Sequence, residues 1–366
     1  MQNNENNQPL FISEEWISGE SCLFTITNIF EHSKAKNILM PMRKKFMNQL
    51  QNEGFEIVTD RKNVPDNAFY LTMNDFALCN DDIEPGVWKK LFDKKVFESG
   101  GEKFNYPRSL TMEEYFSNPF FPAVFKNEIA NGGKDKFLIE TPNQLEIIKS
   151  FYNDFINDSY YKQIFDLCIF QQFIETPTNY KTYMRVLMGA SGDVMGASLK
   201  YSLIKRELKQ DIGDLEEYFS DANSKYFLDS KSMFGYYSGG GNISFSQPRY
   251  SYEKKEILKA HNIDSDNPKV PDDVLEVSQS IVQNCHSMLG VICGIDFIYN
   301  INDGKWYYLE LQAFPAIDEW ADVKRIKLPK RKDLNGYLEL LEIELEARHE
   351  ALTLLRNKKI KNKSNR

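Results

Sequence analysis

The sequence predicts a mixed α/β and α+β fold in which a small N-terminal α/β domain precedes a longer region of alternating strands and helices. Strand and helix patterns alternate along most of the chain, and its 366 residues, 42% of them hydrophobic and 27% charged, suffice for two or three packed units. Segment 294–315 reads as a β-hairpin, because aromatic and β-branched runs flank Asn302-Asp303-Gly304. This composition excludes a disordered or fibrous protein.

The first hundred residues alternate between strand and helix patterns. We expect strands at 22–29, 55–59 and 68–73, and a helix at 34–54 that ends at Gly54. These elements predict a polar N-terminal tail at 1–20 and a small α/β domain at 21–110.

From residue 122 onward, short strands alternate with marked helices. Thr141, Pro142 and Gln144 supply the N-cap, the first-turn proline and the capping-box glutamine of one helix. Further amphipathic helices are predicted at 271–289 and 333–355, and the apolar side of the second must be buried against something. The aromatic stretch 227–250 has no periodicity and predicts a loop.

The charge and the cysteine content indicate which partners and which cellular compartment to expect. The formal charge is -8 and the pI is near 5.3, so nothing in the overall field favours a nucleic acid partner. Five scattered Cys indicate reduced thiols, and we expect a soluble cytoplasmic protein without a signal peptide or membrane span. Residues 356–366 hold six Lys or Arg and no acid; we expect a solvated, frayed tail, with a docking element for an acidic partner as the alternative.

The predicted hairpin carries oxygen ligands. Alternation along a strand places Glu310 and Gln312 on one face, and Asp296 on the partner strand can reach that face. Two carboxylates and an amide oxygen form a hard site that suits Mg²⁺. The alternative is that these residues are the hydrated face of an ordinary hairpin.

A lysine strand lies upstream. The run 121–126 is apolar and ends in Lys126, and Gly132-Gly133-Lys134 follows before another strand at 137–140. Backbone N–H groups of a glycine loop can approach phosphate oxygens closely, as a bound triphosphate requires. The Walker A spacing is absent, and a hairpin turn with a chance lysine remains the alternative.

Two further strands carry polar residues. Strand 168–175 contains Gln171 and Gln172, and the apolar strand around Arg185 contains one charge. A cation among apolar neighbours is costly unless it is paired or faces a ligand. Arg185 therefore either forms a structural salt bridge, for instance with a hairpin carboxylate, or contacts a ligand.

Together and in this order, these segments resemble the ATP-grasp superfamily over roughly residues 85–316. The resemblance implies that a nucleotide lies between two α+β subdomains, at 111–178 with the phosphate loop and at 179–330 with the metal site. A C-terminal helix with the basic tail, 331–366, completes the chain. ATP and Mg²⁺ are the implied cofactors.

The resemblance also implies roles for individual residues. Arg185 and Lys126 would be catalytic, and the metal ligands would be Asp296, Glu310 and Gln312. Nucleotide contacts would come from Lys94, Lys126, Gly132, Gly133, Gln171, Gln172, Phe173, Ile174, Lys200 and Asn242. Two positions depart from the family: Gln312 replaces the usual Asn, and Asp135 follows the phosphate loop where relatives often have glycine.

The implied activity is that of a carboxylate–amine ligase, which forms an amide through an acyl phosphate and releases ADP and phosphate. The substrate would be an amino acid, a small peptide or a precursor peptide, and a homodimer is one expected assembly. No side-chain nucleophile is needed, which agrees with the absence of a Ser–His or Cys–His signature. A kinase of the same fold and a nucleotide-binding protein without turnover are the alternatives.

Overall fold

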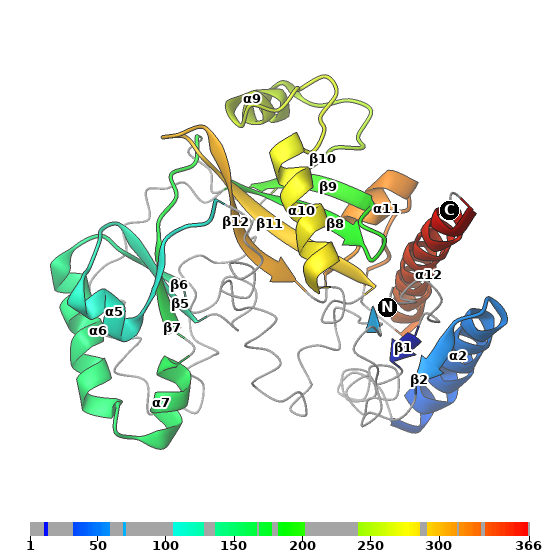
Figure 1. Ribbon diagram of the computed structural model, residues 1–366, viewed down its shortest axis with the longest axis horizontal. Helices are drawn as coiled ribbons and strands as arrows, with labels where there is room; N and C mark the ends of the chain where they lie inside the picture. The colour runs from blue at the N-terminus through cyan, green and yellow to red at the C-terminus, as the bar shows by residue number, and fades with distance from the viewer. Residues whose placement is uncertain are drawn as a thin grey trace, which may run out of the picture.

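The computed structural model describes residues 11–13, 32–58, 69–70, 105–127, 136–166, 168–177, 182–201, 241–285, 291–312, 315–330 and 334–364. The strands of these segments form three sheets (Figure 1). The predicted strand 22–29, Lys94 and the phosphate loop with Gly132, Gly133 and Asp135 lie outside them. Among the described helices, none is long and apolar enough to cross a membrane.

The N-terminal sheet is parallel. Strand β1 (Phe11–Ser13) pairs with β2 (Glu56–Val58) and β3 (Phe69–Tyr70), and α2 (His32–Asn52) lies between β1 and β2 in the chain. Gly54 follows α2 with a φ of 88°, which a residue without Cβ adopts freely. The predicted polar tail at 1–20 is wrong at β1, where the apolar pair Phe11-Ile12 begins a strand.

The four-stranded antiparallel sheet has the order β4-β7-β5-β6. Its strands are β4 (Ser109–Thr111), β5 (Ala123–Asn127), β6 (Lys136–Ile139) and β7 (Cys168–Gln172). Helices α5 (Met112–Ser117), α6 (Pro142–Phe155) and α7 (Ser159–Phe165) cover one face, where buried aromatic and aliphatic side chains form a core. The predicted capping box at Thr141 and Gln144 is confirmed.

The five-stranded sheet has the order β10-β9-β8-β11-β12, with antiparallel neighbours throughout. Its strands are β8 (Thr182–Gly189), β9 (Val194–Tyr201), β10 (Gly241–Ser244), β11 (Ile292–Asn300) and β12 (Lys305–Gln312). The predicted hairpin is β11–β12, with Gly304 at a φ of 68° in its turn. The prediction of a loop throughout 227–250 is wrong at β10, because pairing with β9 orders a segment whose own pattern is not periodic.

Both faces of the five-stranded sheet are partly covered by helices (Figure 1). Helices α9 (Tyr252–Ala260) and α10 (Asp272–Cys285) pack on one face. Helix α11 (Asp318–Lys324) contacts β8 and β9, and its apolar residues share a core with α2 and α12 (Leu334–Ser364). The apolar side of α12 is thus buried within this chain.

The basic C-terminal segment is helical through Ser364, so the expected frayed tail is wrong over that range. Lys358 Nζ donates to the Ser191 carbonyl at 2.6 Å, and Arg356 Nη1 donates to the Glu53 carbonyl at 2.9 Å. These bonds anchor α12 to the β8–β9 turn and to the end of α2.

Two backbone bonds join the larger sheet to the segments that flank the smaller one. The Tyr308 amide donates to Asn105 O at 2.8 Å, and the Ile301 amide donates to Glu175 O at 2.9 Å. Asn105 precedes β4 and Glu175 follows β7, so both ends of the four-stranded unit are tied to the β11–β12 hairpin.

Candidate functional site

A row of polar residues crosses the five-stranded sheet. Each residue lies directly opposite the next on neighbouring strands, in the order Ser244, Ser198, Arg185, Asp296 and Glu310. Gln312 is two residues beyond Glu310 on β12, and Lys200 is two residues beyond Ser198 on β9. Since side chains alternate along strands, this face gathers predicted site residues from all five strands, Asn242 on β10 included.

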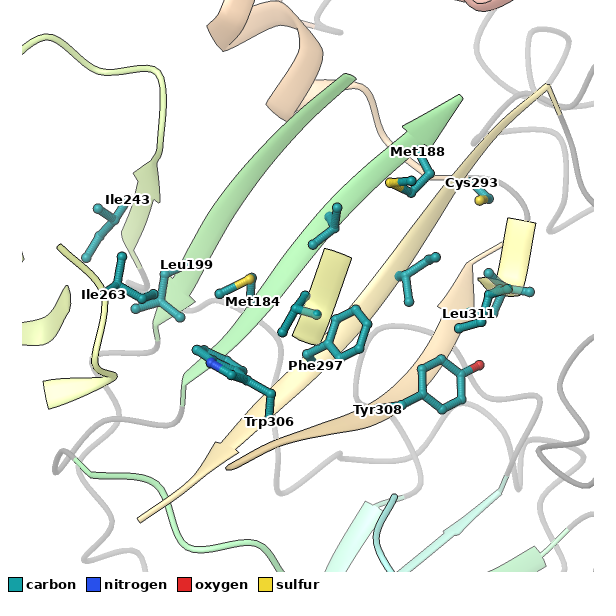
Figure 2. Close-up of a cluster of buried hydrophobic side chains, with 14 of the residues drawn as sticks. Met184, Met188, Leu199, Ile243, Ile263, Cys293, Phe297, Trp306, Tyr308 and Leu311 are labelled. Atoms are coloured by element: carbon teal, nitrogen blue, oxygen red, sulfur yellow. The ribbon is translucent and has the colours of Figure 1, made fainter. Parts of the chain in front are cut away.

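The opposite face of the same strands is apolar. Figure 2 shows Met184, Leu199, Phe297, Tyr308 and Leu311 in the buried cluster covered by α9 and α10. Sequence neighbours of the polar residues therefore occupy the core, and the polar side chains point away from it.

A β-bulge sets the direction of Glu310. Asp296 pairs with Glu310 and Phe297 pairs with Tyr308, so Leu309 is left unpaired on β12. Without this extra residue, Glu310 would share a face with Tyr308, which is in the apolar core. The bulge places Glu310 beside Asp296, as bulges next to functional sites often do.

Arg185 and Asp296 form a buried two-bond ion pair. Arg185 Nε donates to Asp296 Oδ1 at 2.8 Å, and Nη2 donates to Oδ2 at 2.7 Å. Only 7% and 3% of these side chains are exposed. Burial raises the pKa of Asp296, the Arg185 guanidinium lowers it, and the nearby Glu310 and Glu319 carboxylates raise it, so that the pKa lies above its usual value.

The three predicted metal ligands lie together at the end of this row. Asp296 and Glu310 are paired across β11 and β12, and Gln312 Nε2 donates to Glu310 Oε1 at 3.4 Å. That bond uses the Gln312 amide nitrogen and not its oxygen. In the described part of the chain, no group of three or more His, Cys, Asp or Glu is placed to hold a metal, so the predicted metal site would have two carboxylates and this amide as its ligands.

A second buried ion pair involves Glu319 of α11, which the sequence analysis missed. Lys200 Nζ lies 2.6 Å from Glu319 Oε1, and Ser198 Oγ donates to the same oxygen at 2.8 Å. Burial raises the pKa of Glu319, but Lys200, Arg185 and Ser198 together lower it below its usual value. The only local signal for this site was an acidic pair, Asp318-Glu319, at the start of a short helix.

Asn242 lies next to this pair. It is opposite Lys200 across β9 and β10, and its Nδ2 donates to Asp322 Oδ2 at 3.5 Å. Burial raises the pKa of Asp322. Lys254 Nζ donates to the Asn242 carbonyl at 3.0 Å, so α9 holds the start of β10.

On the four-stranded sheet, Lys126 and Gln171 lie on the face turned away from the helical core. Both are buried, and their strand neighbours Phe125 and Phe170 belong to that core. Gln171 Nε2 donates to Ser109 Oγ at 3.0 Å. Lys126 and Gln171 therefore share one face of this sheet, whereas Gln172, the next residue on β7, lies on the other.

The four consecutive residues predicted to contact the nucleotide, Gln171 to Ile174, divide into two pairs. Gln171 and Gln172 end β7, whereas Phe173 and Ile174 lie in the segment that leads to β8. The Gln172 backbone amide donates to Arg108 O at 2.7 Å, and the Phe173 amide donates to Pro122 O at 3.3 Å. Ile174 is buried.

Comparisons with known proteins give structural similarities only. No protein-family model matches the sequence, and no curated protein does. Solved structures to which the chain is similar include the ATP-grasp ligase PsnB complexed with minimal precursor, Mg and ADP: 12% identity, TM-score 0.37, covering 92% of this chain and 77% of that one.

Two further ligases are similar at the same level. D-alanine–D-alanine ligase from Bacillus anthracis matches at 12% identity and a TM-score of 0.38, covering 96% of this chain and 98% of that one. L-amino acid ligase from Bacillus licheniformis matches at 12% identity and a TM-score of 0.36, covering 76% and 55%.

Proposed function

We propose that this chain is an ATP-dependent carboxylate–amine ligase of the ATP-grasp superfamily. It would transfer the terminal phosphoryl group of ATP to a substrate carboxylate, and an amine would then displace phosphate to form an amide. The nucleotide would lie between the polar faces of the four-stranded and five-stranded sheets. We place the activity in the cytoplasm, on an amino acid, a small peptide or a precursor peptide.

The polar row beside the β11–β12 hairpin carries this proposal. Buried ion pairs contribute little stability compared with apolar residues of similar volume. Even so, one sheet face holds Arg185 with Asp296 and Lys200 with Glu319, next to a further carboxylate at Glu310. Such a concentration of fixed charge suits a highly charged ligand such as a magnesium-bound triphosphate.

The hairpin residues fit a Mg²⁺ ion by their chemistry. Asp296, Glu310 and the Gln312 amide oxygen would hold it, because this ion prefers oxygen ligands. Each Asp296 oxygen accepts one bond from Arg185 and retains further lone-pair capacity. When bound, the ion would neutralise charge on the transferred phosphoryl group.

The remaining roles belong to side chains of the two sheets. Arg185, oriented by Asp296, would contact the transferred phosphoryl group with a guanidinium that matches its oxygens. Lys126 would contact the nucleotide phosphates from the smaller sheet, and Lys200 and Asn242 would do so from the larger one. The segment from Gln171 to Ile174 would contact the adenine, while Lys94, Gly132 and Gly133 keep the phosphate roles predicted for them.

Hydroxylamine trapping tests the reaction class. With ATP, Mg²⁺ and a panel of amino acids and peptides, a ligase yields a hydroxamate, because hydroxylamine attacks the acyl phosphate. A stable phosphoester in its place would identify a kinase. Nucleotide binding without either product would identify a binding protein.

Two substitutions test the site. Glu310→Ala and Lys126→Ala should each lower ADP formation by about 100-fold or more, since metal and phosphate contacts are lost. The exposed residues Glu339 and Lys259 provide matched controls, and Glu339→Ala and Lys259→Ala should leave the rate unchanged. Parental rates for both site variants would contradict the assigned roles.

A further inference from the structure

Residues on one face of strand β9 contact Glu319. A Cβ at Gly196 would lie 2.4 Å from the Glu319 carbonyl oxygen, so only glycine allows α11 to approach this closely. Two residues on, Ser198 donates to Glu319 Oε1, and a further two residues on, Lys200 pairs with the same oxygen. Three successive residues on this face of β9 therefore contact one glutamate.

The Glu319 carboxylate interacts with two cations of this sheet, Lys200 and Arg185. It is fully buried, and both Lys200 and Arg185 lower its pKa through their charges. Its other oxygen, Oε2, is buried and has no hydrogen-bond partner among the described residues. One oxygen of Glu319 thus pairs with Lys200 and accepts a hydrogen bond from Ser198, and the Glu319 charge also interacts with Arg185.

The Lys200 ammonium needs a fixed acidic partner to stay in one position. Lysine is a point charge on a stem with four rotatable bonds, so without a fixed partner its ammonium can take many positions. The buried Glu319 carboxylate fixes the ammonium at 2.6 Å from Oε1, and 12% of the lysine side chain remains exposed.

We infer that Glu319 is a positioning residue, which holds the Lys200 ammonium on the face of β9 where it contacts the phosphates of a bound nucleotide. This inference rests on the proposed function, because Lys200 is assigned there to the nucleotide. It assigns no contact between Glu319 and the ligand.

A double-mutant cycle on nucleotide affinity tests the inference. The probe is a fluorescent N-methylanthraniloyl derivative of ADP, titrated with Mg²⁺ into the full chain. Lys200→Met and Glu319→Gln should each weaken binding by roughly 10-fold, because a charge-assisted contact is lost or displaced. The double variant should bind like Lys200→Met alone, since Glu319 acts through the lysine.

Matched variants distinguish the positioning of Lys200 from a purely structural role of Glu319. Asp318→Asn removes the acid next to Glu319 in the first turn of α11 and should leave the affinity unchanged. Breaking a buried pair can unfold a protein; if Glu319→Gln does not fold, Glu319→Asp keeps the charge and should weaken binding by a smaller factor.

The outcomes separate this inference from the proposed function. Parental affinity in folded Glu319→Gln or Glu319→Asp would overturn the inference, as would losses that simply add in the double variant. No binding of the probe to the parental chain would overturn the proposed function itself.

Discussion

The five-stranded and four-stranded sheets each turn one polar face away from a helical core, but they stabilise their polar groups differently. On the larger sheet, Arg185 and Lys200 are each paired with a buried acid. On the smaller sheet, Gln171 forms a hydrogen bond between neutral groups, with Ser109. The proposed metal and phosphoryl site therefore lies on the sheet with fixed charge pairs, and the nucleotide contacts proposed for the smaller sheet come from amide and lysine side chains.

The largest effect on stability is expected at the Arg185–Asp296 pair. Asp296→Ala leaves a buried guanidinium without its counterion and should lower the free energy of unfolding by about 3–5 kcal/mol. Urea denaturation of both proteins measures this difference. Asp266→Ala, which removes an exposed partner of Lys255, should change stability far less.

Replacing both members of the buried pair sharpens this test. Arg185→Met combined with Asp296→Leu should recover most of the lost stability, since no unpaired charge remains. If Asp296→Ala were as stable as the parental chain, the fixed charges of the larger sheet would have no structural importance.

A smaller effect is expected from acid pH on the covered face of the same sheet. His261 is buried, and its ring nitrogens lie 2.6 Å from Thr182 Oγ1 and 2.7 Å from the Ile257 carbonyl. Burial lowers the pKa of His261 to about 4, although the Ile257 carbonyl raises it. In the unfolded chain the pKa of His261 is near 6.5, so the unfolded state takes up a proton at a higher pH than the folded state. The stability that the neutral, buried His261 contributes is therefore fully present above pH 6.5 and is lost as the pH falls towards 4.

The lost contribution should amount to about 3 kcal/mol. NMR titration of the His261 ring gives its pKa directly, and urea denaturation at pH 7 and pH 4.5 gives the stability change. The four-stranded unit contains no histidine between residues 105 and 177 and should lack this response. A His261 ring that titrates near 6.5 would contradict the expected burial.

The smallest effect is expected in the four-stranded unit, at the start of α6. Thr141 Oγ1 accepts from the Gln144 amide at 3.4 Å, and the Gln144 side chain accepts from the Thr141 amide at 3.0 Å. Thr141→Ala should therefore lower the free energy of unfolding by about 1 kcal/mol. Asn143→Ala, at an exposed position one residue before Gln144, serves as the control, and equal losses in both variants would argue against the capping role.

Local chemistry explains which elements could be predicted from the sequence. The capping box at Thr141 and the turn before Gly304 depend on residues a few positions apart, and both are confirmed. Alternation on β12 also predicted that Glu310 and Gln312 share a face. The bulge at Leu309, which turns both towards Asp296, depends on pairing with β11 and has no local signal.

Long-range contacts explain what was missed. The sequence left open whether Arg185 pairs with a hairpin carboxylate, and the structure shows that pair with Asp296, 111 residues away. Glu319 contacts Ser198 across 121 residues, and the helical C-terminal segment is anchored by Ser191 and Glu53. None of these partners lies within the window in which helix or strand periodicity can be recognised.

The most direct test of the two-sheet site is titration calorimetry of the full chain with ADP, in the presence and absence of Mg²⁺. We expect Mg²⁺ to tighten ADP binding by at least about 10-fold in the parental chain, and Glu310→Ala to abolish that gain while retaining weak metal-independent binding. If ADP does not bind, or if Mg²⁺ leaves its affinity unchanged in the parental chain, the site proposed on the five-stranded sheet is contradicted.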